Sequence, residues 1–471
     1  MSTFPILLSL WAGCASWFPA EVVHSEACAC QITLPPGMWL EESLIDEAAI
    51  QRSKVFDELY FVLEAMPRSI WAPLTLPTIL DRVAALDQET PPEFAGPVVF
   101  GDIDGRPMAT RDVFENLPGP TRVRKRYGVI DTKQQILIFQ IWTLKSRWDA
   151  HQSQIDALTA SLELDSRTER VPWEGEPKVT LHRRDLMAFR EDNPTSVRPT
   201  ERQPVPQVPE GAPFEVVKYP SEGKKLMAFL SRDPGDGARH PAVIWITGGS
   251  MGLSSTVLEA QPAEDDQSAL TFHEAGIVTM VPGFRGEAGN PGASEWWFGE
   301  TEDLIAAAAW LAKRPFVDPE RIYLAGHSGG GTDVLLAAVA SDAFRAAFSI
   351  GGRPQMEAIA TEGGYGTEPY DIQQPAEITA RSAIHWADRV QVPLYYFEGD
   401  LAYGRDGVAM AAAARAAERP MWAHLVYNRD HNTLLVPVKS LIIERILQDT
   451  GPEWTGAFTP EQIYNAAIAV P

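Results

Sequence analysis

Ser328 lies in the pentapeptide Gly326-His-Ser-Gly-Gly330, between a short apolar run that begins at Arg321 and a helical pattern that continues to Ala340. A strand, a turn without side chains beside the serine, and a helix are the parts of a nucleophile elbow. The pattern therefore predicts that Ser328 is a nucleophile. Glycines also flank serines in ordinary strand-to-helix turns, so the prediction depends on finding an acid and a base further along the chain.

Three histidines follow Ser328, and the base of an elbow enzyme comes after its nucleophile and its acid. His385 falls in a helical stretch, and His424 falls inside the last expected strand. His431 comes directly after that strand, where a loop can carry the imidazole back over the serine. His431 is therefore the predicted base.

The acid is expected at the end of the preceding strand, in the segment Phe397-Glu-Gly-Asp400. A carboxylate there can fix the imidazole tautomer and balance the imidazolium that forms during attack. Asp400 is the predicted acid. Asp406 is its rival, because hydrolases with an elbow often place the acid a few residues past the glycine. Glu398 is less favoured, because it precedes the turn.

An oxyanion needs two preorganised backbone donors, and removing one such donor costs about 3 kcal/mol of transition-state stabilisation. The amide of Gly329 can provide one donor. The segment Thr247-Gly-Gly-Ser-Met-Gly252 follows the third strand of the second domain and can provide the other from Gly249 or Ser250. Glycines there let the backbone approach a substrate closely. Further candidates for the substrate pocket are His327, Arg285 and Tyr403.

The elements that must position these groups alternate between strand and helix signals from Phe214 onward, which predicts an α/β fold with a largely parallel sheet. In such a sheet, chemistry belongs at the carboxyl ends of the strands. The eight expected strands, the first two antiparallel, are 214–219, 225–230, 242–246, 277–281, 322–325, 346–350, 393–397 and 422–427, and the clearest helices are 302–314 and 408–418.

Over roughly Phe214 to Thr450 the sequence resembles the catalytic domain of the prolyl oligopeptidase and acyl-peptide hydrolase branch of the α/β-hydrolases. Thr247-Gly-Gly-Ser250 stands where that family usually has His-Gly-Gly-Pro, and Gly283-Phe-Arg-Gly286 matches its Tyr-Arg-Gly loop. Further matches to the family pattern are Asp303, Trp310-Leu311, Val317-Asp-Pro319 and the run from Arg321 to Gly330.

Two positions depart from that family. Thr247 replaces the histidine before the paired glycines, and the usual His-Gly-x-x-Asp acid motif reads Glu398-Gly-Asp-Leu-Ala402. The resemblance implies a serine hydrolase that works through a Ser-His-Asp triad and an acyl-enzyme. Peptidases of the family commonly carry a β-propeller, and no propeller repeat is visible, so small acyl esters or short peptides are the expected substrates. The alternatives are a dipeptidyl or acylaminoacyl-type serine peptidase and, in another class, a non-catalytic binding scaffold.

The segment 353–381 between the sixth and seventh expected strands is rich in glycine, tyrosine and acidic residues. It is expected to form part of a lid or pocket wall. Its acidic residues Glu357, Glu362 and Glu368 are candidates for binding a substrate amine, with a solvated loop as the alternative reading.

A smaller α+β domain is predicted for residues 28–166. Strands are expected at 32–39 and 58–65, a helix at 76–86, a strand that reaches a turn at Asp104-Gly105, a hairpin from 122–129 and 135–144, and a closing helix from Trp148 that carries His151, Ile155, Leu158 and Leu162. This order resembles small domains of the PsbP-like type, which carry no catalytic signature. The basic run at 122–126 is expected on the solvated face of a strand. Residues 167–210 are rich in proline and predict a linker to the catalytic domain at 211–471.

Composition limits the remaining classes of function. The formal net charge of −23 argues against nucleic acid as a partner. The three cysteines, Cys14, Cys28 and Cys30, imply no disulfide framework. His24 with Cys28 and Cys30 could form a partial metal site, but it lacks a convincing fourth ligand and the usual Cys-x-x-Cys spacing. Neither a metal nor another cofactor is expected, and the oligomeric state stays open.

Residues 1–27 are expected to be flexible or signal-like, but no Lys or Arg precedes their apolar segment, so a cytoplasmic location is favoured. No other stretch is long and apolar enough to span a bilayer.

Overall fold

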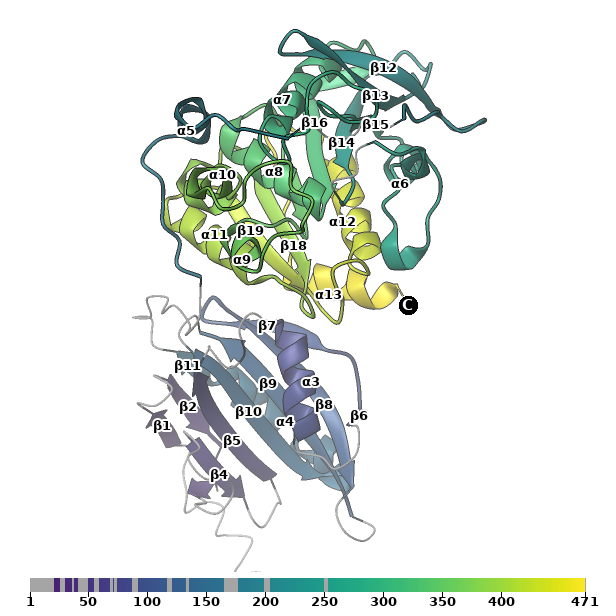
Figure 1. Ribbon diagram of the computed structural model, residues 1–471. Helices are drawn as coiled ribbons and strands as arrows, with labels where there is room; N and C mark the ends of the chain where they lie inside the picture. Colours follow the sequence, from purple (N-terminus) through teal and green to yellow (C-terminus); the bar gives the residue numbers. More distant parts are fainter. Residues whose placement is uncertain are drawn as a thin grey trace, which may run out of the picture. The chain divides into compact units, whose positions relative to one another are not determined.

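The computed structural model describes residues 21–25, 30–35, 38–40, 50–54, 59–67, 71, 74–86, 92–116, 121–132, 135–164, 177–198, 204–249 and 253–470 (Figure 1). The chain divides into two compact units, Met1–Glu176 and Pro177–Pro471. Among the described residues, no helix combines the length and the apolar character that crossing a membrane requires.

The second unit is built on one sheet, in which the structure describes eight strands. They are β12 (Phe214–Ser221), β13 (Lys224–Ser231), β14 (His240–Ile246), β15 (Val278–Pro282), β16 (Val317–His327), β17 (Ala347–Ile350), β18 (Leu394–Gly399) and β19 (Met421–Val426). Their order is β12-β13-β15-β14-β16-β17-β18-β19, with β13 antiparallel to both of its neighbours and parallel pairing from β15 to β19. This confirms the predicted eight-stranded α/β-hydrolase sheet.

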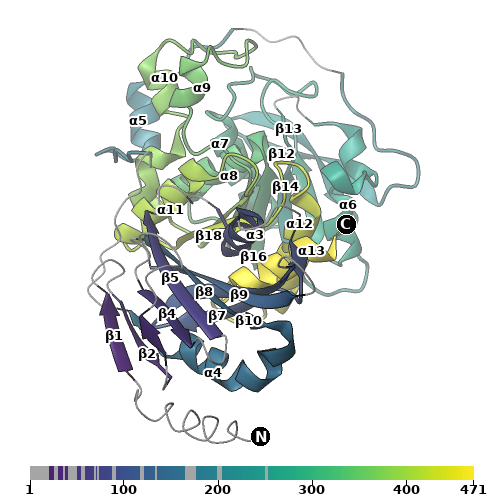
Figure 2. The same ribbon diagram turned by 90° about the horizontal axis from the view of Figure 1, so that it is seen from below.

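Helices cover both faces of this sheet because successive side chains of a strand point to opposite faces. In β13, Leu226 and Ala228 pack with α7 (Glu300–Leu311), α8 (Gly329–Ala340) and α11 (Arg405–Ala416). Met227 and Phe229 pack with α6 (Leu270–Glu274), α12 (Leu435–Gln448) and α13 (Pro460–Ala469) on the other face (Figures 1 and 2). Two apolar layers therefore enclose the sheet.

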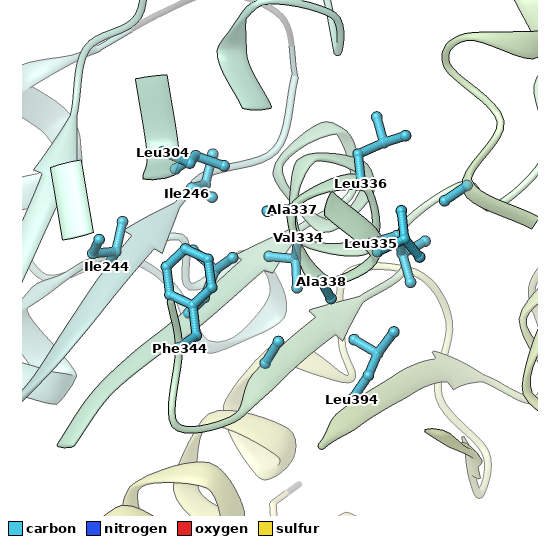
Figure 3. Packing of buried hydrophobic residues seen from close by; sticks show 14 of the residues in the cluster. Ile244, Ile246, Leu304, Val334, Leu335, Leu336, Ala337, Ala338, Phe344 and Leu394 are labelled. Carbon is cyan, nitrogen blue, oxygen red and sulfur yellow. The ribbon is translucent and has the colours of Figure 1, made fainter. Parts of the chain in front are cut away.

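Helix α8 is packed into the first of these layers over most of its length. Val334, Leu335 and Ala338 are fully buried and lie among strand residues such as Ile244 and Leu394 (Figure 3). Fully burying a side chain such as Val or Leu contributes about 1.5–3 kcal/mol. The beginning of α8, where the elbow lies, is therefore held by a rigid core.

The proline-rich stretch is not a free linker over its whole length, because residues 177–198 belong to the second unit. Helix α5 (Leu186–Asp192) packs there, and the fully buried guanidinium of Arg190 donates to the carbonyl oxygens of Trp297 (2.6 Å), Phe298 (2.7 Å) and Ala380 (2.9 Å). Residues 177–198 of the predicted linker at 167–210 therefore pack on the second unit. Prolines limit regular secondary structure in much of this stretch. The short helix α5 between them still allows Arg190 to anchor the segment.

The remaining short elements of the second unit lie outside the sheet. They are η3 (Ser255–Leu258), η4 (Ala263–Asp265), α9 (Glu357–Thr361), α10 (Pro375–Thr379) and η5 (Ala383–Arg389). Helices α9 and α10 fall within the segment 353–381, for which the sequence predicted a lid or pocket wall.

The first unit is rich in strands. A larger sheet runs in the order β3 (Trp39–Leu40), β4 (Ile50–Lys54), β5 (Leu59–Pro67), β10 (Gln135–Leu144), β9 (Arg122–Asp131), β8 (Arg106–Asn116) and β6 (Glu93–Phe94), with β7 (Val99–Ile103) paired to β8. A smaller sheet joins β1 (Glu21–Ser25), β2 (Cys30–Leu34) and β11 (Leu162–Leu164), and the described helices include α3 (Leu76–Leu86), α4 (Trp148–Ala160) and η2 (Lys145–Arg147).

Most expectations for the first unit are confirmed. The 76–86 helix and the 122–144 hairpin are present, and Asp104 and Gly105 turn between β7 and β8 with φ of 51° and 74°. Leu162 was predicted on the closing helix but lies in β11 instead, because α4 ends at Ala160. The likeness to PsbP-like domains stays a prediction.

Two details of the first unit concern charge and sulfur. In the basic run at 122–126, Arg124 and Arg126 both pair with Asp112. A carboxylate of the neighbouring strand β8 therefore neutralises part of the positive charge of this run. Cys30 is disulfide-bonded, which differs from the expectation that the cysteines imply no bridge. Cys14, Cys28 and the signal-like residues 1–20 lie outside the described residues.

Candidate active site

Ser328 occupies the turn between β16 and α8 in a conformation that few residues adopt. Its φ of 52° and ψ of −114° lie outside the regions that L-residues favour. The turn is fixed at both sides, because the Ser328 amide donates to the Ile350 carbonyl (2.8 Å) and the Ser328 carbonyl accepts from the Thr332 amide (3.0 Å). Backbone strain of this kind is characteristic of functional sites.

The glycines around Ser328 are required by close backbone contacts. A β-carbon on Gly326 would lie 2.5 Å from the Gly330 carbonyl oxygen, and one on Gly330 would lie 2.5 Å from the Ile246 carbonyl oxygen. A β-carbon on Gly329 would lie 2.5 Å from the Gly249 carbonyl oxygen. The glycines of the Gly-x-Ser-x-Gly pattern are therefore needed because neighbouring backbone segments leave no room for a side chain. This is the reason for glycine in a nucleophile elbow.

His431 lies in the loop between β19 and α12, and its carboxylate partner is Glu398. The Nδ1 atom of His431 is 3.1 Å from Oε2 of Glu398, whose side chain is 1% exposed. Because an ionised carboxylate only accepts hydrogen bonds, Nδ1 carries the hydrogen. The other oxygen of Glu398 accepts from the Gly399 amide (2.8 Å). The carboxylate is thus fixed by one backbone and one imidazole contact.

The carboxylate that the structure records at Nδ1 of His431 is that of Glu398, whereas the predicted acid was Asp400. Asp400 lies one residue beyond β18, and its Oδ1 accepts from the Asn428 amide (2.9 Å), which fastens the turn before His431. Asp406, the rival, lies in the first turn of α11. Glu398 was disfavoured because it precedes the turn, but its longer side chain reaches the imidazole from inside the strand.

Gly351 explains how the two side chains can meet. It follows β17 with φ of 64°, and a β-carbon there would lie 2.6 Å from Cε1 of His431 and 3.3 Å from Oε2 of Glu398. The imidazole and carboxylate therefore pass directly over a residue that has room for no side chain. Sequence analysis did not identify this glycine.

His327 was predicted as a candidate for the substrate pocket. Its side chain is buried, with 1% of it exposed. Its Nε2 is 2.8 Å from the His431 carbonyl oxygen, and its Nδ1 is 2.7 Å from Nε2 of Gln267. The Oε1 of Gln267 accepts from the Gly248 amide (3.0 Å). Burial lowers the pKa of His327 to about 4, which agrees with a neutral ring that donates from Nε2 and accepts at Nδ1. Gln267 and His327 therefore connect the glycine loop after β14 to the loop of His431.

The glycine loop and the elbow bring two backbone segments together. Gly249, with φ of 83°, faces Gly329, and its nitrogen would lie 3.6 Å from a β-carbon on Gly329. These are the two amides that the sequence suggested as oxyanion donors. Ser250, the alternative donor, lies outside the described residues.

Arg285 and Tyr403 were predicted for the substrate pocket, and neither lines the cavity that borders the elbow. Arg285 is buried, and its Nε and Nη2 donate to the two oxygens of Asp303 (3.0 and 2.9 Å). Although burial opposes it, these contacts hold the pKa of Arg285 above its ordinary value. Tyr403 is 62% exposed, with Arg353 4.3 Å above its ring. Arg285 is thus a structural anchor of the loop after β15.

The two histidines that were not chosen as the base, His385 and His424, have other contacts. His385 bonds Glu357 (2.6 Å) and the Thr180 carbonyl (2.9 Å), which also occupies one of the acidic residues suggested for amine binding. His424 lies in β19 as expected, and burial lowers its pKa to about 4. The choice of His431 by elimination agrees with these positions.

A cavity of about 40 Å³ lies beside the elbow. It is bordered by the glycine loop at Gly248 and Gly249 and by Trp296 and Trp297 in the loop before α7. The indole of Trp297 donates to the Gly329 carbonyl (2.9 Å), which ties this wall to the elbow. Three acidic side chains, Glu287, Glu300 and Asp333, also line the cavity, and sequence analysis singled out none of them.

The fold and the elbow define the second unit as an α/β-hydrolase. Within it, residues 264–403 match the model of the prolyl oligopeptidase family. This match covers the elbow and Glu398, and it makes the chain a serine hydrolase. The resemblance noted from the sequence is confirmed for the C-terminal half.

Individual proteins are also similar to parts of this chain. The chain is 23% identical over 212 residues to an uncharacterized peptidase of Bacillus subtilis (strain 168), YtmA, across 42% of this chain and 77% of that protein. Similar solved structures include a hyperthermophilic esterase from the archaeon Pyrobaculum calidifontis (17% identity, 56% and 90% of the two chains, TM-score 0.39). An acetyl xylan esterase from Paenibacillus sp. R4 is similar too (16% identity, 57% and 96% of the two chains, TM-score 0.41).

Proposed function

We propose that the second unit hydrolyses small acyl esters or short peptides through Ser328, His431 and Glu398. The observation that carries the proposal is the contact of Glu398 with Nδ1 of His431 directly above Gly351, in a loop that His327, the neighbour of the strained serine, holds through the His431 carbonyl. A buried carboxylate on Nδ1 leaves Nε2 of the imidazole as the acceptor for the serine proton.

In the proposed reaction, Oγ of Ser328 attacks the carbonyl carbon of the substrate while Nε2 of His431 takes the hydroxyl proton. The amides of Gly329 and Gly249 donate to the oxyanion. The C–O or C–N bond to the leaving group then breaks, and His431 returns the proton to that group. Water repeats the attack on the acyl-enzyme, which releases a carboxylic acid and restores the serine.

Ser328 and His431 are both described, and between them the structure records no direct hydrogen bond. Such contacts are often long in enzymes without substrate and tighten only in the complex. Their proximity is supported instead by His327, the neighbour of Ser328, whose ring centroid is 4.8 Å from that of His431. The network through Gln267 fixes the same two loops relative to each other.

A fluorophosphonate probe tests the nucleophile. We expect labelling of the wild type and of Ser440→Ala, an exposed serine that serves as the matched control, and no labelling of Ser328→Ala. Labelling that survives in Ser328→Ala would contradict the assignment. Absence of labelling in the wild type, with no turnover of any p-nitrophenyl ester, would favour the non-catalytic scaffold.

A peptidase activity is the second candidate, favoured by the family match at 264–403 and by the printed name of the Bacillus relative. Rates for short p-nitrophenyl esters and for aminoacyl nitroanilides, measured side by side, separate the two. Cleavage of the esters alone would identify an esterase, because a peptidase would also cleave the nitroanilides.

A further inference from the structure

The cavity beside the elbow contains more acidic groups than its surroundings neutralise. Glu287, Glu300 and Asp333 all line it, and they are 9%, 2% and 5% exposed. Within the described residues, none of the three forms an ion pair with Arg, Lys or His. The nearest cation that acts on Asp333 is Arg190, whose hydrogen bonds go to carbonyl oxygens and to Thr301.

The three acids differ in how they are satisfied. Glu300 accepts from the amides of Glu295 (2.8 Å), Trp296 (3.1 Å) and Phe298 (3.2 Å), so it holds the tryptophan loop. Glu287 accepts a long bond from the Ser294 hydroxyl (3.5 Å) and has a backbone hydrogen bond at Phe284. Oδ1 of Asp333 is buried and, among the described residues, lacks any hydrogen-bond partner. A buried polar atom of this kind normally has a partner, which in this cavity is missing.

The walls of the cavity are suited to a cation as well. Trp296 and Trp297 are adjacent bulky residues with φ of 47° and 63°, a conformation that is costly for such side chains and that places both indoles at the cavity. Their rings lie 5.6 Å apart, and the faces of aromatic rings attract cations. Phe284 adds a third ring to the lining.

We propose, building on the proposed hydrolase function, that this cavity is a specificity pocket for a primary ammonium group carried by the acyl part of the substrate. The cavity adjoins the elbow, because Gly248 lines it and a β-carbon on Gly248 would lie 3.1 Å from Cβ of Ser328. Asp333 supplies the unpaired acceptor, Glu287 supplies a second carboxyl, and the two indoles form the sides.

Size and hydrogen bonding select the kind of cation. A cavity of about 40 Å³ holds about three water-sized groups, which suits an ammonium on a short methylene stem. A primary ammonium also has three N–H donors, one of which can satisfy Oδ1 of Asp333. A quaternary ammonium has no donor and would leave that oxygen unpaired.

Without a ligand the acids are expected to retain protons. Burial raises the pKa of Glu287 to about 8, and burial together with the charges of Glu300 and Glu287 raises the pKa of Asp333 well above its ordinary value. Entry of an ammonium favours the ionised carboxyl, so binding releases a proton near neutral pH.

Matched p-nitrophenyl esters test the proposal and distinguish the two sources of an ammonium. Nα-acetyl-lysyl and Nα-acetyl-norleucyl esters differ only by the side-chain ammonium, whereas norleucyl and hexanoyl esters differ only by the α-amine. We expect the wild type to favour the charged member of one pair by about 10- to 100-fold in kcat/KM, since charge-assisted hydrogen bonds are the strong ones. Asp333→Asn should reduce that ratio to about 1, and Glu320→Gln, which removes an exposed acid on another part of the unit, should retain it.

The outcomes separate this inference from the proposed function. Turnover of the neutral esters with a ratio near 1 in both wild-type pairs would overturn the pocket and leave the hydrolase intact, as would a ratio that survives in Asp333→Asn. Loss of neutral-ester turnover together with loss of fluorophosphonate labelling in the wild type would instead overturn the hydrolase.

Inhibition of the wild type keeps the test independent of whether Asp333→Asn folds. We expect propylammonium to inhibit hydrolysis of the hexanoyl ester competitively, and n-propanol and tetramethylammonium to inhibit it at least about tenfold more weakly, because neither combines a charge with N–H donors. Equal inhibition by all three would contradict the ammonium pocket.

Discussion

Replacing Glu398 by glutamine should inactivate the enzyme far more than replacing Asp400 by asparagine. Glutamine keeps the size of Glu398 and can still accept from Nδ1 of His431, but it removes the negative charge. Glu398 is 1% exposed, so water does not screen its charge from the imidazolium that forms during attack. Asp400, by contrast, accepts from the Asn428 amide, and an asparagine oxygen can accept the same bond.

The magnitude follows from that charge pair. At an effective dielectric constant of about 20, two unit charges about 4 Å apart attract each other by about 4 kcal/mol. A loss of this size in the transition state corresponds to about a 10³-fold decrease in kcat. For Asp400→Asn we expect kcat within about tenfold of the wild type and a decrease of about 1 kcal/mol in the free energy of unfolding.

The assay is kcat for a p-nitrophenyl ester at saturating substrate, with fluorophosphonate labelling rates as an independent reading of serine reactivity. Asp406→Asn serves as the control for the remaining candidate acid, and thermal melting excludes loss of folding. A 10³-fold loss in Asp400→Asn combined with a nearly normal Glu398→Gln would refute the assignment of the acid.

Three further predictions concern the residues around His431 and Glu398. Gly351→Ala should reduce kcat by at least about 10²-fold while the protein stays folded, because its β-carbon would displace the His431 ring; a normal kcat would contradict this geometry. Gln267→Leu should reduce kcat by a factor about ten times larger than the factor by which it changes KM, because it leaves Nδ1 of His327 unpaired and disconnects the glycine loop. Equal effects on kcat and KM would argue for a role in binding. For His327, a folded pKa of about 4 against about 6.5 unfolded means that its stabilising contribution is complete above pH 6.5 and is lost as the pH falls towards 4, by up to about 3 kcal/mol in urea titrations. His327→Gln should remove this contribution and leave a similar one from His424, whose pKa burial also lowers to about 4; an unchanged pH dependence would show that His327 does not cause it.

The sequence sufficed for the strands, the elbow and His431 because each leaves a local pattern. The eight strands are short apolar runs, and the glycines beside Ser328 are required by contacts within a few residues or with one neighbouring loop. His431 could be selected because only three histidines follow the serine. The buried acids of the cavity had no such pattern, since Glu287, Glu300 and Asp333 are brought together by tertiary packing alone.

Glu398, the proposed acid, was disfavoured from the sequence because its contact with His431 depends on sheet register. Ile350 pairs with Phe397 across β17 and β18, so the next residues, Gly351 and Glu398, lie side by side where His431 returns over the sheet. One residue along either strand would point to the other face. In the sequence, the two acids of the segment Glu398-Gly-Asp400 have the same alternation, and only their position relative to the turn favoured Asp400. The glycine in the neighbouring strand breaks this symmetry, because only a position without a β-carbon leaves room for the imidazole and the carboxylate to meet.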